Sequence, residues 1–309
     1  MRIEKNGISG FGEAAPNIRY NETPESTVET IKEAESLFEK YSLLHFVDLG
    51  NAIKEVTEEQ TAAKAALDIA IMDWVTKNLE VPIYQYFGLD KSKVPITSFS
   101  IGIDKPEIIR QKVKEAKQFP VLKIKVGKDN DEEILETVRS VTDKPLRVDA
   151  NEAWTNKEEA LRKIKWLETL NVEFIEQPMP SSMQEEIGWL HTRVNMPIIA
   201  DEAVKRTTDI PKLAQGYDGI NIKLMKSGGI QEALRMIGMA RALGMKIMLG
   251  CMIESSVAIA AAAHISPLVD WVDLDGHLII SNDPFKGLGL ENGKILLNDN
   301  PGLGVEGEF

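Results

Sequence analysis

From about residue 94 onward, short runs rich in strand-forming residues alternate with longer stretches in which apolar residues recur at helical spacing. The short runs have the length of strands. Eight of them can be recognised, at 95–101, 121–126, 145–150, 173–177, 197–201, 219–224, 246–252 and 271–275. Their starts lie roughly 22 to 28 residues apart, which is the length of one strand, one helix and two short loops. The pattern therefore predicts eight strands joined by helices.

The stretches between these runs are amphipathic and charged. The clearest helices are predicted at 105–118, 131–141, 157–170 and 229–243. A helix after each strand lets the chain cross to a parallel neighbour, and eight parallel strands close into a barrel with its site at their C-terminal ends. An open doubly wound sheet is the alternative, but no Gly-x-Gly-x-x-Gly turn follows the early strands to hold a dinucleotide. We therefore favour the barrel.

The segments on either side of the barrel have a different pattern. Two helices are expected at 26–41 and 57–79, and Thr57 with Gln60 is a candidate capping box for the second helix. The tail of the chain is rich in Gly and Pro and has no strong period. We expect a capping domain at 1–92, a barrel at 93–281, and a C-terminal segment at 282–309 that packs on the capping domain.

Composition narrows the classes of function. The 309 residues suffice for a barrel and a small accessory domain, and the formal net charge is −12. No Lys/Arg-rich stretch offers the basic surface that nucleic acid requires, so the expected partner is a small-molecule substrate. The single Cys251 excludes an intramolecular disulfide. The start of the chain has no apolar core of signal-peptide length, and the longest apolar run, at 257–265, is too short to span a bilayer. We expect a cytoplasmic protein without membrane contact, and the sequence leaves self-association into a homo-oligomer open.

Ionisable residues gather near the C-terminal ends of the predicted strands. Lys123 and Lys125 lie two positions apart on the second strand, so both side chains point to the same side of the sheet. The later strands contribute, in order, Asp149, Glu176, Asp201, Lys223, and the pair Asp273 and Asp275. A lone Lys-x-Lys, or a single acid at a strand end, is common without any function. Only the ordered set of such residues across strands two to eight is specific enough to indicate a site.

In a closed barrel of eight strands, the second strand lies about opposite the sixth. Asp149, Glu176 and Asp201 would then form an arc of oxygen ligands suited to Mg²⁺. Lys125 and Lys223 would approach the centre from opposite sides. A metal can stabilise the enediolate that forms when the α-proton of a carboxylate is removed, while one lysine takes the proton and the other returns it. This arrangement predicts racemisation or epimerisation.

Lys123 and two aspartates support this chemistry. A lysine acts as a base only when its pKa is lowered, and the charge of Lys123 beside Lys125 disfavours the protonated form of Lys125. Asp273 and Asp275 would face the metal across the barrel mouth. There they would hold a cation at the far end of the substrate.

At these residues the sequence resembles the muconate-lactonising subgroup of the enolase superfamily, and within it the dipeptide epimerases. The resemblance runs from Gly10 to the C-terminus. The matching segments are Gly12-Glu-Ala-Ala-Pro16, Lys123-Ile-Lys125, Val148-Asp-Ala-Asn151, Ile175-Glu-Gln-Pro178, Ala200-Asp-Glu202, Ile222-Lys-Leu224, Met252-Ile-Glu-Ser255 and Asp273-Leu-Asp275-Gly276.

The resemblance implies an α/β fold, namely an enolase-type (β/α)7β barrel with a small α+β capping domain. It implies that Lys125 and Lys223 are the acid/base pair, and that the α-ammonium group of a dipeptide binds Asp273 and Asp275. It further implies Mg²⁺ as cofactor, with the ligands Asp149, Glu176 and Asp201, and a substrate lining that includes Ser100, Met252 and Ile253. The implied activity is epimerisation at the C-terminal residue of a dipeptide.

The front of the chain departs from the family pattern. Family members have an additional strand and a flexible specificity loop before the segment that begins here at Gly10, so the capping domain is expected to be shortened. A shortened lid would exclude water less well and weaken activity. Arg19, in the segment that follows, could meet a substrate carboxylate or be an exposed loop arginine.

Two alternatives stay open. An o-succinylbenzoate synthase or a lactonising cycloisomerase would share the lysines and the metal site, but would leave Asp273 and Asp275 without a cationic partner. A truncated relative could bind ligand without turnover. The four histidines (His45, His191, His264 and His277) lack the spacing of a zinc site and are expected to be structural.

Overall fold

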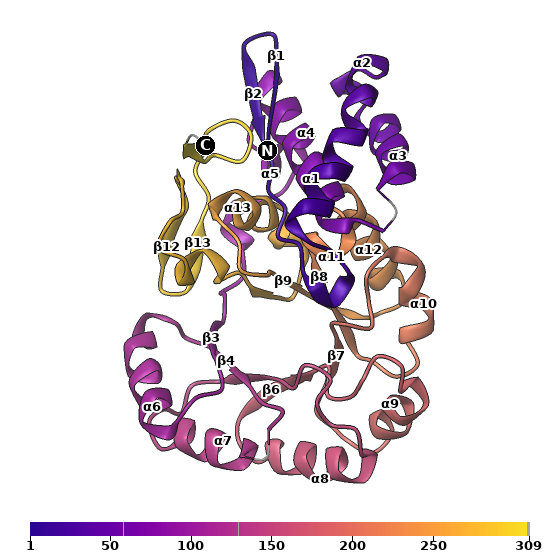
Figure 1. Ribbon diagram of the computed structural model, residues 1–309. Helices are drawn as coiled ribbons and strands as arrows, with labels where there is room; N and C mark the ends of the chain where they lie inside the picture. The colour runs from indigo at the N-terminus through magenta and orange to yellow at the C-terminus, as the bar shows by residue number, and fades with distance from the viewer. Residues whose placement is uncertain (58, 129, 308–309) are drawn as a thin grey trace.

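The computed structural model describes residues 1–57, 59–128 and 130–307. Its centre is a parallel sheet of eight strands in which strands consecutive in the chain are neighbours (Figure 1). The strands are β3 (Phe99–Ile101), β4 (Leu122–Lys125), β5 (Leu146–Asp149), β6 (Val172–Glu176), β7 (Ile198–Ala200), β8 (Gly219–Lys223), β9 (Lys246–Gly250) and β10 (Trp271–Asp273). A parallel bridge between Thr97 and Val272 joins the two edges, so the sheet closes. The predicted barrel is confirmed.

Seven helical connections run along the outside of the barrel. They contain α6 (Pro106–Glu115), α7 (Asp131–Arg139), α8 (Lys157–Leu167), α9 (Gln184–His191), α10 (Ile210–Leu213), the pair α11 (Leu224–Ser227) and α12 (Ile230–Ala242), and α13 (Ser256–Ile265). Local sequence sets several of their starts. The side chain of Asn156 caps α8 and that of Ser255 caps α13, while a proline opens α6. The order of strands and helices is (β/α)7β, as expected.

The N-terminal segment forms a hairpin and a group of helices above one end of the barrel (Figure 1). Its elements are β1 (Arg2–Lys5), β2 (Ile8–Phe11), α1 (Pro24–Glu33), α2 (Leu37–Lys40), α3 (Phe46–Val56), α4 (Thr61–Asn78) and α5 (Ile83–Tyr86). Sequence analysis missed the hairpin and α3. The hairpin turn carries Asn6 and Gly7, both at positive φ, and this pair is the usual signal for a two-residue turn.

The expected capping box at Thr57 and Gln60 is wrong. Thr57 lies at the C-terminal end of α3, where its hydroxyl donates to the carbonyl of Ile53 at 2.7 Å. The capping box of this segment is instead at Thr23 and Ser26, at the start of α1. A threonine can satisfy either end of a helix, and the competing bond to the preceding turn decided the outcome here.

Helix α4 is buried on nearly all sides because it belongs to two apolar cores. Ala65 and Ile69 are among its residues in the barrel core, whereas Leu67 and Ile71 lie in the core of the N-terminal segment. Strand β2 approaches α4 so closely that a Cβ atom on its Gly10 would clash with the backbone oxygen of Ala70 in the helix. The helix therefore joins the N-terminal segment to the barrel.

The C-terminal segment returns to the N-terminal one. It contains β11 (Phe285–Lys286), β12 (Gly289–Glu291), β13 (Lys294–Leu296) and β14 (Glu306–Gly307). The amide of Leu303 donates to the carboxylate of Asp73 on α4, and the rings of Phe11 and Phe285 pack edge to face. Among the described residues, no helix combines the length and the apolarity needed to cross a bilayer.

His264 joins α13 to these two segments. Its Nδ1 accepts from the amide of Tyr84 at 3.1 Å, its Nε2 lies 3.0 Å from the carbonyl of Leu303, and its ring stacks on Tyr84. Burial lowers the pKa of His264 to about 4. The histidine is therefore neutral in the folded chain at neutral pH.

We expect this histidine to make the chain less stable as pH falls below 6.5. The unfolded chain takes up a proton on His264 near pH 6.5, but the folded chain does so only near pH 4, so protonation stabilises the unfolded state relative to the folded state between these values. Between pH 7.5 and pH 5 the loss should be about 2 kcal/mol. Urea unfolding of the wild type and of His264→Gln at both pH values measures it. If both proteins lost the same free energy of unfolding between these pH values, titratable groups other than His264 would be responsible.

Candidate active site

The C-terminal ends of the barrel strands surround a cavity of about 570 Å³. Residues from the loop at 15–20 in the N-terminal segment form part of its wall. Nine of the candidate site residues from the sequence lie in the lining, namely Arg19, Ser100, Lys123, Lys125, Lys223, Met252, Ile253, Asp273 and Asp275. The three acids expected to bind metal are buried and do not contribute to the lining.

These three acids form a compact cluster. Asp149 and Glu176 end neighbouring strands and are partners in register, and Asp201 directly follows the next strand. One carboxylate oxygen from each residue lies within 4.8 Å of the others. Their exposed fractions are 0, 0 and 1%. Buried carboxylates at this distance repel one another, so nearby cations are needed to balance their charge. Three oxygen donors of this kind are ligands suited to Mg²⁺.

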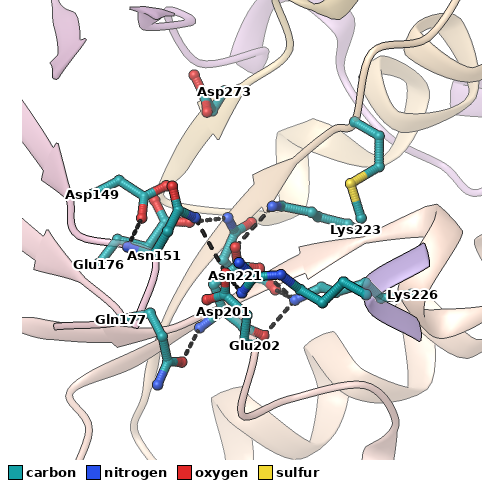
Figure 2. A network of polar contacts seen from close by, with 12 residues as sticks. Asp149, Asn151, Glu176, Gln177, Asp201, Glu202, Asn221, Lys223, Lys226 and Asp273 are labelled. Atoms are coloured by element: carbon teal, nitrogen blue, oxygen red, sulfur yellow. Dashed lines mark hydrogen bonds and ion pairs between the residues drawn. The ribbon is translucent and has the colours of Figure 1, made fainter. Parts of the chain in front are cut away.

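Several lysines contact this cluster, and Figure 2 shows two of them, Lys223 and Lys226, on the side of Asp201. The ammonium group of Lys123 lies 2.7 Å from Glu176, 3.0 Å from Asp149 and 2.9 Å from Asp273. Burial alone would lower the pKa of Lys123, but the charges of Asp149, Asp273 and Glu176 hold that pKa well above its usual value. Lys123 is therefore a fixed positive charge beside the cluster, and three carboxylates balance it.

The two expected bases contact different acids of the cluster. Lys125 on β4 lies 2.6 Å from Asp149, and Lys223 on β8 lies 2.8 Å from Asp201. Three strands separate β4 from β8 in the closed sheet, so the lysines reach the cavity from opposite parts of the barrel wall. The side chain of Lys125 is 30% exposed and that of Lys223 is 9% exposed. Such an arrangement can hold or move a proton on either side of a bound molecule.

Asp273 and Asp275 are not equivalent. Both oxygens of Asp273 are occupied, one by the hydroxyl of Ser98 at 2.7 Å and the other by Lys123 at 2.9 Å. Asp275 accepts the amide of Ser100 at 2.7 Å on one oxygen. Burial and the nearby charge of Asp273 raise the pKa of Asp275 to about 6. Asp275 is therefore the better placed of the two to take a further donor from the cavity.

The residues that hold the acids in place were not predicted from the sequence. Asn221 donates to Glu176 at 2.7 Å, and the buried Lys226 donates to the carboxylate and the carbonyl of Asp201. Asn221 lies two positions before Lys223 on β8, so strand periodicity places both on one face and could have revealed it. Lys226 lies on the short helix after that strand, where strand periodicity no longer applies.

The N-terminal segment also contacts the barrel at this site. The guanidinium group of Arg19 lies 2.8 Å from Glu152 and 2.8 Å from Glu202, two residues just beyond β5 and β7. Arg19 is part of the cavity lining. This cation therefore lies at the cavity, held by two carboxylates, and is not a free loop arginine.

Comparison with known sequences points to one family. A family model described as enolase C-terminal domain-like matches residues 108–308. An L-Ala-D/L-Glu epimerase of Bacteroides thetaiotaomicron is 47% identical and covers 99% of this chain and 80% of its own length. An L-Ala-D/L-amino acid epimerase of Pedosphaera parvula is 40% identical, with coverages of 96% and 86%.

Solved structures agree with the sequence relatives. A dipeptide epimerase of Enterococcus faecalis complexed with Mg and L-Leu-L-Tyr superposes with a TM-score of 0.90 at 33% identity, covering 98% of this chain and 90% of the other. A dipeptide epimerase of Cytophaga hutchinsonii complexed with Mg and D-Ala-L-Val gives 0.93 at 27% identity, with coverages of 99% and 87%. An N-succinyl Arg/Lys racemase of Bacillus cereus gives 0.92 at 28% identity, also with 99% and 87%.

Proposed function

The chain belongs to the enolase superfamily, and on that premise we propose that it is a Mg²⁺-dependent dipeptide epimerase. The observation that carries the proposal is the pair Lys125 and Lys223, which lie on strands far apart in the barrel and contact different acids of one buried cluster. The sequence relatives are named as epimerases, and two of the superposed structures hold Mg together with a dipeptide.

In this proposal Asp149, Glu176 and Asp201 hold the ion. When bound, Mg²⁺ supplies positive charge that stabilises the negative charge developing on the substrate carboxylate. Lys123 adds a fixed positive charge next to the same site.

The two remaining lysines exchange the α-proton. One of them, uncharged, takes the proton from one face of the C-terminal residue, and the other, protonated, returns a proton to the opposite face. The configuration at the α-carbon is thereby inverted. Either lysine can begin the reaction, depending on which diastereomer is bound.

Recognition of the dipeptide would come from the lining. We assign the α-ammonium group of the substrate to Asp275, because the contacts of Asp273 already use both of its oxygens. Arg19 would meet an acidic side chain, and Ser100, Met252 and Ile253 would line the rest of the molecule. A substrate of this kind has a carboxylate at one end and a cation at the other.

Incubation in deuterated water tests the proposal. With Mg²⁺ and L-Ala-L-Glu, the C-terminal residue should gain one mass unit while the D-epimer accumulates. L-Leu-L-Tyr and N-succinyl-L-arginine serve as alternative substrates. No exchange with any dipeptide would contradict the proposal, and exchange only in the N-succinyl compound would indicate a racemase of acylated amino acids.

Substitution of Asp275 further distinguishes a dipeptide epimerase from a racemase of acylated amino acids. Asp275→Asn should raise the KM for dipeptides by roughly tenfold or more, because a charge-assisted bond to an ammonium group is lost. It should leave the KM of an N-acylated amino acid unchanged, because that compound has no ammonium group. Equal effects on the two classes of substrate would argue against the assignment of Asp275.

A further inference from the structure

Gln177 directly follows Glu176, and its side chain is completely buried. It uses its full hydrogen-bonding capacity without contacting the cavity. The side-chain oxygen accepts from the backbone amides of Asp201 at 2.9 Å and Ala203 at 3.1 Å. The side-chain nitrogen donates to the carbonyl of Met179 at 2.8 Å and to the hydroxyl of Tyr217 at 3.0 Å.

The backbone of Gln177 makes further links between strand ends. Its amide donates to the carbonyl of Ile199 on β7 at 2.9 Å, and its carbonyl accepts from the amide of Glu152 beyond β5 at 2.9 Å. Gln177 has a φ of +35°, a value that a residue with a side chain adopts only when its surroundings impose it. One residue therefore ties together the ends of β5, β6 and β7, the three strands that carry the acid cluster.

We propose that Gln177 is a positioning residue that fixes the distance between the carboxylates of Glu176 and Asp201 and so sets the affinity for Mg²⁺. This inference rests on the proposed function only in taking these acids as metal ligands. Figure 2 shows the amide beside the backbone of Asp201, on the far side from Lys223. Groups that orient metal ligands without touching the metal commonly govern its affinity.

The chemistry of the amide explains why glutamine suits this position. The site presents two donors to one side-chain atom and two acceptors to the other, and only an amide offers both kinds of group at this length. A glutamate would present acceptors to the carbonyl of Met179, and a methionine would leave four buried polar groups without their bond. Either change should allow the turn that contains Asp201 to shift relative to Glu176.

Magnesium binding without substrate tests this inference. We expect Gln177→Met and Gln177→Glu to weaken the binding of Mg²⁺ by about 10- to 100-fold in titration calorimetry. Tyr217→Phe removes one bond and leaves both contacts to the Asp201 turn, so it should weaken binding only about two- to fivefold. In activity assays, the Mg²⁺ concentration for half-maximal rate should rise in the same order, while kcat at saturating Mg²⁺ should be much less affected.

Thr76→Val is a matched control, because it removes a buried hydroxyl in α4 that donates to the carbonyls of Met72 at 2.7 Å and Asp73 at 3.3 Å. It should lower the melting temperature without changing the affinity for Mg²⁺. Folded Gln177→Met or Gln177→Glu protein with the affinity of the wild type would overturn the inference. If neither variant folds, Tyr217→Phe provides the test, and an affinity for Mg²⁺ equal to that of the wild type would overturn the inference. A wild-type chain that binds no Mg²⁺ would instead contradict the proposed function.

Discussion

Lys125→Met should lower the rate of dipeptide epimerisation by at least about a thousandfold, because one of the two groups that move the α-proton is missing. The loss should appear as failure of either diastereomer to convert into the other. Exchange with solvent deuterium should nevertheless persist in one diastereomer, since Lys223 can still remove and return a proton on its own face. Lys223→Met should show the same loss of conversion with exchange in the opposite diastereomer. Mass spectrometry of chirally separated dipeptides measures both quantities.

Lys163 provides the control for these substitutions. It is a buried lysine paired with Asp131 at 2.8 Å, it lies on α8, and it does not line the cavity. Lys163→Met should reduce stability and leave epimerisation near the wild-type rate. If Lys125→Met and Lys223→Met both retained exchange in the same diastereomer, the two lysines would have to act on one face, and the two-base mechanism would be wrong.

Glu176→Gln should weaken Mg²⁺ binding by at least about a hundredfold and reduce activity correspondingly, because one of three anionic oxygen ligands becomes a neutral amide. The wild type treated with EDTA should be inactive and should recover when Mg²⁺ is added. Calorimetry and the dependence of rate on Mg²⁺ concentration measure the two effects.

A second glutamate on the same strand is the control. Glu173 lies at the start of β6 and pairs with Arg147 at 2.9 Å, away from the acid cluster. Glu173→Gln should bind Mg²⁺ as the wild type does. Wild-type affinity in Glu176→Gln would exclude this acid as a ligand and leave Asp149 and Asp201 as an incomplete site.

The barrel could be predicted because short runs rich in strand-forming residues recur at even spacing along the chain. Strands β5, β7 and β8 are buried along their whole length, but only β7 is a continuous apolar run, because β5 and β8 also carry site residues such as Asp149 and Lys223. The period of two along a strand then placed Lys123 and Lys125 on the same side, and both line the cavity. The order of strands in a barrel then predicted that the acids of three successive strands lie together and that Lys125 and Lys223 lie on opposite sides.

What could not be predicted depends on contacts between distant segments. Thr57 has the local pattern of a helix start, yet its hydroxyl bonds to the preceding helix. The balance of charge at Lys123 depends on Asp273, which is 150 residues away in the chain. No periodicity indicates which amides the side chain of Gln177 accepts from. Such partners are defined only once the barrel has closed.

The packing of helix α4 limits how the N-terminal segment can move to admit a substrate to the cavity. Its carboxylate Asp68 accepts from the first amides of α12, and its other faces are enclosed by β2 and the N-terminal core. Swinging the whole N-terminal segment away from the barrel would expose the barrel core, to which α4 contributes Ala65 and Ile69. The short stretch around Arg19 is held to the barrel by two ion pairs, which can break and re-form with little loss of packing, so this stretch can move at the cavity without the rest of the segment.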